Sequence, residues 1–190
     1  CPDGTVRPLL PAEMPLSPKE MAAELIAKSG VWKSKEQYLV TLFILEPLQL
    51  LWEQALQEGR VDDLKGHRNC QSASELCPMR SIFLHGPGGS GKTFCMPEVV
   101  LKVYRHFLGE TGAKAIAATN SNARMLLGKT MHAAGKMVRG QSLKASGLKP
   151  TSRQRKALER EWQEAWLLLI DEIGLASPPL LAGVCRRVFH

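Results

Sequence analysis

The sequence has 190 residues, 44% hydrophobic and 23% charged, which is typical of a globular protein with a buried core. Its net charge is +7, and its five cysteines are irregularly spaced, which argues against a disulfide framework and favours a reducing compartment. No apolar run reaches the ~18 residues of a membrane span, and the first residues do not resemble a secretory signal, so we expect neither.

Residues 1–33 predict a proline-rich linker and a short helix. Ser17 is the predicted N-cap, Pro18 the first helical residue and Glu20 the capping-box partner. The helix is expected to stop at Ser29, before a glycine.

Residues 34–80 predict a helical N-terminal extension followed by a loop. From Lys35 to Glu58, apolar residues recur at three- and four-residue spacing, which indicates a long helix kinked or split at Pro47. Residues 59–79 are polar and irregular, which is typical of a loop.

Residues 81–190 alternate short apolar runs with helical patterns, which predicts a parallel α/β sheet with flanking helices. The predicted strands, all buried, are 81–85, 113–118 and 166–170. The predicted helices are 92–108, 122–127, 152–165 and a last one capped at Ser177, with Leu181, Val184, Cys185 and Val188 on one face.

A glycine-rich stretch lies between the first of these strands and the helix after it. It fits the phosphate-loop pattern G-x-x-x-x-G-K-[ST], in which glycines let backbone N–H groups converge on phosphate oxygens. Lys92 is expected to reach the β- and γ-phosphates, and the Thr93 hydroxyl to ligate Mg²⁺. The alternative is a glycine-rich turn that binds nothing. The predicted nucleotide-binding residues are Gly86, Gly88, Gly89, Ser90, Gly91, Lys92 and Thr93.

Two adjacent carboxylates follow the last apolar strand. Ligand sites of parallel sheets lie at the carboxyl ends of the strands. Asp171 is therefore expected to hold Mg²⁺, and Glu172 to orient and deprotonate the attacking water. The alternative is an exposed strand end without function. The two motifs together predict Mg²⁺-dependent nucleoside triphosphate hydrolysis, with Lys92 and Glu172 as the catalytic residues.

Positive charge is concentrated between Thr111 and Leu158, where there are ten basic residues and no acidic one. Such segregation indicates a polyanion-binding face, and the alternative is a solvated basic loop. The stretch also offers hydroxyl, amide and cationic groups suited to a single-stranded phosphate backbone. The alternative is that the hydroxyl of Thr119 or Ser121 only caps a helix N-terminus. The candidate nucleic-acid contacts are Thr119, Asn122, Lys129, Thr130 and His132.

From Ser81 to Ala176 the sequence resembles the Pif-type, RecD-like branch of superfamily 1 DNA helicases. The resemblance rests on HGPGGSGKT, on the Thr119 stretch with its G-x-T-x-H, on LLLIDEIG and on their spacing. It implies an incomplete first RecA-like motor domain of an ATP-dependent DNA helicase, with ATP and Mg²⁺ as cofactors and single-stranded DNA as partner. Gln37 is similar to the glutamine that reads adenine in such helicases, although a solvent-facing helix glutamine is an alternative.

The family's second RecA-like domain and arginine fingers are expected outside this sequence, so the chain alone should bind nucleotide and hydrolyse it poorly. An intracellular location is expected, nuclear in a eukaryote. The alternatives are a phosphate-loop ATPase that does not move on DNA, and a degenerate remnant that binds nucleic acid by charge alone. Two further readings are a zinc site from His67, Cys70, Cys77 and His85, and core packing of Trp162 and Trp166 in preference to base stacking.

Overall fold

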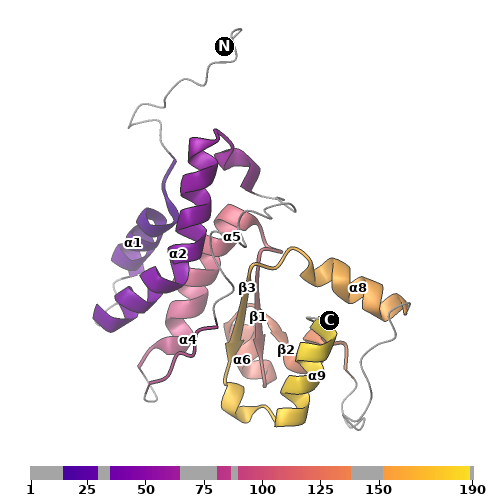
Figure 1. Ribbon diagram of the computed structural model, residues 1–190. Helices are drawn as coiled ribbons and strands as arrows, with labels where there is room; N and C mark the ends of the chain where they lie inside the picture. Colours follow the sequence, from indigo (N-terminus) through magenta and orange to yellow (C-terminus); the bar gives the residue numbers. More distant parts are fainter. Residues whose placement is uncertain (1–14, 30–34, 65–80, 87–89, 138–151, 189–190) are drawn as a thin grey trace. The chain divides into compact units, whose positions relative to one another are not determined.

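The computed structural model describes residues 15–29, 35–64, 81–86, 90–137 and 152–188 (Figure 1). The chain divides into two compact units, Cys1–Pro87 and Gly88–His190. The described secondary structure of the first unit is helical, and that of the second combines helices with a sheet.

The N-terminal unit begins with helix α1, Pro18–Ser29, whose predicted capping box is confirmed. The backbone N–H of Ser17 donates to Glu20 Oε2 over 2.8 Å, and the N–H of Glu20 donates to Ser17 Oγ over 3.3 Å. The hydrogen bonds from Ser17 lower the pKa of the Glu20 carboxyl from 4.5, because they stabilise its charged form. The predicted end at Ser29 is also confirmed.

Helix α2, Lys35–Gln57, is continuous and contains Pro47, so the prediction of a long helix is confirmed and a split is wrong. Its buried side includes Leu45 and Leu48, and α1 packs against it. A short 3₁₀ helix, η2, follows at Val61–Leu64 within the predicted loop.

By length and composition alone, α2 is apolar enough to cross a membrane, and among the described residues it is the one helix that qualifies. Core helices of soluble proteins pass the same test when mostly buried, and 44% of the apolar window is buried here. Polar side chains of α2, among them Glu46 and Gln49, bond to α1. The absence of a membrane span stays a prediction.

The segment Ser81–Gly86 is not a strand, so the prediction of a buried strand at 81–85 is wrong. Phe83 is 75% exposed and Ile82 is 43% exposed. An apolar run becomes a strand only where neighbouring strands accept its backbone hydrogen bonds. None of the described strands pairs with this segment.

The C-terminal unit opens with an unbroken helical run: α4 at Lys92–Cys95, the π-helical turn η3 at Met96–Leu101 and α5 at Lys102–Leu108. It confirms the predicted helix 92–108. Pro97 lies at the start of η3, and because proline has no N–H to donate, the regular hydrogen-bond ladder is interrupted there.

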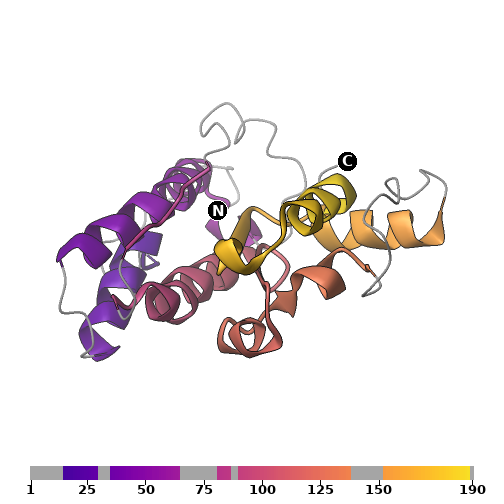
Figure 2. The ribbon, with the colours of Figure 1, turned by 90° about the horizontal axis from the view of Figure 1, so that it is seen from below.

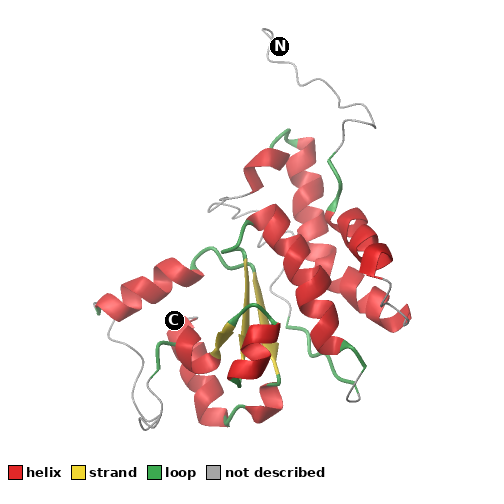
Figure 3. Ribbon diagram, turned by 180° about the vertical axis from the view of Figure 1, so that it is seen from behind, coloured by secondary structure: helices red, strands yellow, loops and turns green. Residues whose placement is uncertain are grey.

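The predicted parallel sheet is confirmed by three strands, β1 at Ala113–Ala117, β2 at Lys129–Thr130 and β3 at Leu167–Asp171 (Figure 3). Their order is β2-β1-β3, and both pairings are parallel. β3 is only half-buried, in contrast to the buried strand expected at 166–170. It pairs with β1 on one side, and no described strand covers its other edge.

Helices cover both faces of the sheet (Figure 2). On one face lies the main core, and on the other lie α6, Asn120–Met125, and the run from α4 to α5. The core face is covered by α7, Met131–Ala134, α8, Arg153–Trp162, and α9, Pro178–Val188. The core residues are Ile116, Met131, Ala134, Leu158, Trp162, Leu180 and Val184.

Two packing predictions need correction. The buried face of α9 is formed by Leu180 and Val184, while Leu181 and Cys185 are only half-buried. Leu180 belongs to the core together with the predicted Val184, and the predicted Val188 packs against that core. Trp162 is buried as expected, but Trp166 is 43% exposed and lies outside the core.

Candidate functional site

The strand register brings three of the predicted motifs to one edge of the sheet. Ala117, the last residue of β1, pairs with Thr130 of β2 and with Asp171 of β3. All three strands therefore finish at the same edge, and the residues that follow them, from Thr119 and from Glu172 onward, begin there. This is the edge at which parallel sheets bind ligands.

The helix that follows the glycine-rich stretch begins toward the same edge. The run from Lys92 ends at Leu108 and is joined to β1 by the short turn Gly109–Gly112, so it lies antiparallel to the strands (Figure 1). Its Lys92 end consequently lies on the side of the unit where β1 and β3 finish.

The described part of the glycine-rich stretch shows why one of its glycines is needed. Gly91 is the N-cap residue of α4 and has φ 77° and ψ 10°, a left-handed conformation that glycine adopts without strain. Lys92 Nζ donates to Ser90 Oγ over 3.1 Å, so its ammonium lies over its own loop. Gly88, Gly89 and the side chain of Thr93 lie outside the described residues. Gly86 is half-buried at the end of the N-terminal unit.

The two carboxylates after β3 have different surroundings. Asp171 is the last residue of β3, and its Oδ2 is buried with no hydrogen-bond partner among the described residues. Glu172 is exposed and has φ 53° and ψ 43°, the left-handed region that costs a residue with a side chain roughly 1–2 kcal/mol. Its carbonyl accepts from Leu175 across the short 3₁₀ helix η4, Ile173–Leu175.

The donor set at this edge fits Mg²⁺. A buried carboxylate oxygen without a partner is costly unless a cation or a donor meets it. Mg²⁺ prefers a few carboxylate oxygens with water and phosphate completing its shell, so one aspartate at a strand end suffices on the protein side. In the described part of the chain no three His, Cys, Asp or Glu side chains gather as a metal cluster. His67, Cys70 and Cys77, from the zinc alternative, lie outside it.

The two threonines of the candidate nucleic-acid site act as helix N-caps. Thr119 Oγ1 accepts from the N–H of Asn122 over 3.2 Å, and Thr130 Oγ1 accepts from the N–H of Ala133 over 3.2 Å. The alternative reading of Thr119 as an ordinary cap is thus confirmed. Each hydroxyl keeps its O–H for donation. Asn122 and His132 are half-buried beside them.

Lys129 pairs with an acidic residue that the sequence analysis did not single out. Its Nζ lies 2.6 Å from Glu161 Oε1, and Lys136 Nζ lies 3.9 Å from Glu161 Oε2. Glu161 belongs to α8, 32 residues beyond Lys129. No sequence signal could have found this pair, because it depends on how α8 packs on the sheet.

Part of the predicted basic face serves the structure instead. Lys114 Nζ lies 5.6 Å from the centre of the Trp162 ring, a cation–π distance. Burial lowers the pKa of Lys114, and the nearby Glu161 carboxylate opposes that shift. Arg187 of α9 was also missed, and it donates to the carbonyls of Gly135 and Lys136 at the end of α7.

Gln37 lies in the N-terminal unit, on the first turn of α2, where its carbonyl accepts from the Thr41 hydroxyl over 2.9 Å. The predicted adenine contact of its side chain stays a prediction.

The fold and the strand-end site define an α/β protein with a small parallel sheet, compatible with part of a RecA-like domain. In sequence, the chain is 30% identical over 104 residues to a curated protein of Trypanosoma brucei brucei described as ATP-dependent DNA helicase PIF6. The match covers 54% of this chain and 12% of that helicase. No protein-family model and no solved structure matches the chain. The match supports a distant helicase-like relationship, without a specific family.

Proposed function

We propose that this chain is part of the first motor domain of an ATP-dependent DNA helicase, of the Pif-type, RecD-like kind that its motifs resemble. In this proposal, ATP binds at Gly86–Thr93, and the energy of its hydrolysis drives movement along single-stranded DNA. The distant relationship to an ATP-dependent DNA helicase supports the proposal.

The observation that carries it is the buried, unpartnered oxygen of Asp171 at the strand edge. A structural aspartate at this position would be expected to accept a hydrogen bond from its own fold. An aspartate that binds a ligand keeps that oxygen without a partner from the protein until the ligand is present. Asp171 and the Lys92 end of the helix lie on the same side of the C-terminal unit, which supports a nucleotide phosphate with its cation as the ligand.

Each of the four predicted site residues would have a separate role in ATP binding and hydrolysis. Asp171 and the hydroxyl of Thr93 would hold Mg²⁺, which supplies charge neutralisation for the phosphates. Lys92 would exchange its bond to Ser90 for phosphate oxygens. Glu172 would orient a water and accept its proton, and its left-handed backbone turns the chain away from β3 immediately after Asp171.

The first test measures nucleotide binding by the whole chain. Titration calorimetry with ATP and Mg²⁺ is expected to show one site, and Lys92→Ala to weaken it at least about 100-fold, since the lysine provides the charge-assisted contacts to the phosphates. Glu98→Gln, which removes an exposed charge paired with Lys102 on the same helical run, is the matched control and should bind as the unchanged chain does. Absence of ATP binding by the unchanged chain would overturn the proposal.

A second measurement separates a helicase from an ATPase that does not act on DNA. Hydrolysis is followed in the full-length protein, with and without a single-stranded oligonucleotide, because the chain alone is expected to hydrolyse ATP poorly. Stimulation by the strand supports the helicase, and equal rates support the other ATPase. Binding of the oligonucleotide without any binding of ATP is the result expected of a degenerate remnant.

A further inference from the structure

The acid-free basic stretch meets an acidic residue in the folded chain. Glu161 lies just beyond this stretch in sequence, and its two carboxylate oxygens approach Lys129 at 2.6 Å and Lys136 at 3.9 Å. We propose that Glu161 occupies the place of a DNA phosphate between Lys129 and Lys136, so that a single strand must displace it in order to bind. The inference rests on the proposed function, because it concerns the same nucleic-acid surface.

The exposure of the three side chains fits such an exchange. The side chain of Lys129 is 58% exposed, that of Lys136 is 35% exposed and that of Glu161 is 23% exposed. The lysines are therefore accessible from solvent, while the carboxylate lies behind them. An ion pair this exposed is weak, so a polyanion competes with it at small cost.

The chemistry of the carboxylate also matches that of a phosphate. Both present oxygens that accept charge-assisted hydrogen bonds from ammonium groups. The single negative charge of Glu161 offsets one of the two positive charges of Lys129 and Lys136, so the pair attracts a polyanion less strongly than two unpaired lysines would. The ten-residue basic excess predicted from sequence is consequently smaller at this point of the surface than the count of residues indicates.

The position of the cluster connects it to the strand-edge motifs. Lys129 lies within the G-x-T-x-H segment, directly before the capping residue Thr130, and Lys136 follows α7. A single strand that crosses from β2 to the end of α7 would reach both of them. Glu161 would thus set the affinity threshold for strand binding without touching the nucleotide residues.

The test is Glu161→Gln in the whole chain, with fluorescence anisotropy of a labelled single-stranded DNA measured over a range of salt concentrations. Releasing two lysines is expected to tighten binding about 3- to 10-fold at low salt and to steepen the logarithmic salt slope by about 1.4. Glu164→Gln is the matched control. It removes the same charge three residues away, where Glu164 Oε2 accepts from the Thr111 hydroxyl over 2.8 Å and the carboxylate acts on Lys114.

The double variant Lys129→Gln with Lys136→Gln shows whether the effect acts through these lysines. Adding Glu161→Gln to it is expected to change nothing. Equal affinity of Glu161→Gln and the unchanged chain would overturn the inference and leave the helicase proposal standing, and so would weaker binding, which would make Glu161 a positioning residue for the lysines. Absence of DNA binding by every variant would overturn both. Far-UV circular dichroism verifies that each variant is folded.

Discussion

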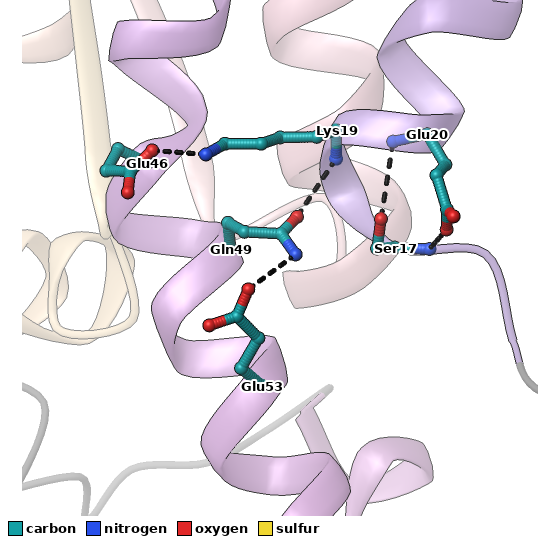
Figure 4. Close-up of polar contacts among 6 residues, drawn as sticks. All are labelled: Ser17, Lys19, Glu20, Glu46, Gln49 and Glu53. Atoms are coloured by element: carbon teal, nitrogen blue, oxygen red, sulfur yellow. Dashed lines mark hydrogen bonds and ion pairs between the residues drawn. The ribbon is translucent and has the colours of Figure 1, made fainter.

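The α1–α2 contact and the end of β3 differ in how their polar side chains are partnered. At the α1–α2 contact, polar groups bond to one another: Lys19 pairs with Glu46, its N–H donates to Gln49 over 3.1 Å, and Gln49 donates to Glu53 over 3.0 Å (Figure 4). At the end of β3, Asp171 keeps a buried oxygen without a partner among the described residues. Partnered groups hold the helices together, and an unpartnered one is available to a ligand.

Backbone geometry shows the same contrast. α1 starts with a reciprocal capping box, in which each partner satisfies the other. The chain leaves β3 through Glu172 in a left-handed conformation, without a side-chain capping bond. Strain and unpaired groups at one sheet edge are the features expected of a binding site rather than of a packing contact. Four substitutions test how far this comparison extends.

The largest effect is expected for Asp171→Asn. Loss of the carboxylate charge should weaken Mg²⁺-dependent ATP binding about 100-fold, while the free energy of unfolding stays level or rises by about 1 kcal/mol, because a neutral amide costs less than a carboxylate to bury without a partner. Calorimetry and urea unfolding measure the two quantities. A large loss of stability would instead make Asp171 a structural residue and remove the contrast.

Gly128→Ala comes next and tests whether the sheet is loosely built. A Cβ at this position would lie 2.3 Å from the carbonyl oxygen of Ala115, so backbone must shift, and we expect a loss of about 2 kcal/mol in urea unfolding. At Gly174 a Cβ meets nothing within 4 Å, so Gly174→Ala is the control and should be neutral. Similar results for both would indicate a loosely packed sheet, in which an unpaired aspartate has no special meaning.

Ser17→Ala removes one half of the capping box and is expected to cost about 1 kcal/mol, with ATP binding unchanged. The cost also depends on pH. The pKa of Glu20 is lowered from 4.5 in the folded chain, so its stabilising contribution is present above that value and is lost as the pH falls through the lower folded one. Ser17→Ala keeps the backbone N–H that is the larger cause of this shift and removes the hydroxyl that is the smaller one, so the difference between variant and unchanged chain should shrink only slightly there. A pH-independent difference would show that the Ser17 hydroxyl does not stabilise the Glu20 charge.

Leu127→Gly has the smallest expected effect. Leu127 follows Leu126, the C-cap of α6, has φ 50° and is 72% exposed, so glycine relieves strain without loss of packing and should stabilise the chain by about 0.5–1 kcal/mol. Met125, 61% exposed but within α6, is the control, because Met125→Gly should destabilise by about 1 kcal/mol. If Leu127→Gly also destabilises, left-handed geometry is not a measure of strain here, and the argument from Glu172 weakens.

Much of the fold follows from local patterns in the sequence. The capping box of α1, the long α2, the helix from Lys92 and the strands β1 and β3 depend on periodicity and on residues close together in the chain. The prediction for residues 81–85 failed because an apolar run of that length does not by itself say which strands will pair with it. Trp166 was misplaced for a similar reason, since burial depends on what covers a strand from outside.

The candidate site divides in the same way. The glycine-rich stretch and the two acids after β3 are contiguous motifs, and their residue types alone indicate phosphate and Mg²⁺ chemistry. Nothing local could reveal that Glu161 lies against Lys129, or that Arg187 bonds to the end of α7. The first contact spans 32 residues and the second 52, and both form only when helices pack on the sheet.

The amino-acid sequence by itself determined the capping box of α1, the helix from Lys92, the α/β alternation and the position of the phosphate-loop pattern, because these depend on backbone preferences and on neighbours within a few residues. Tertiary structure alone decided that β1 lies between β2 and β3, that the oxygen of Asp171 is buried without a partner and that one acid offsets two lysines of the basic stretch. Burial and ion pairing are properties of distant segments brought together, and their free energies exist only once the sheet and its helices have assembled.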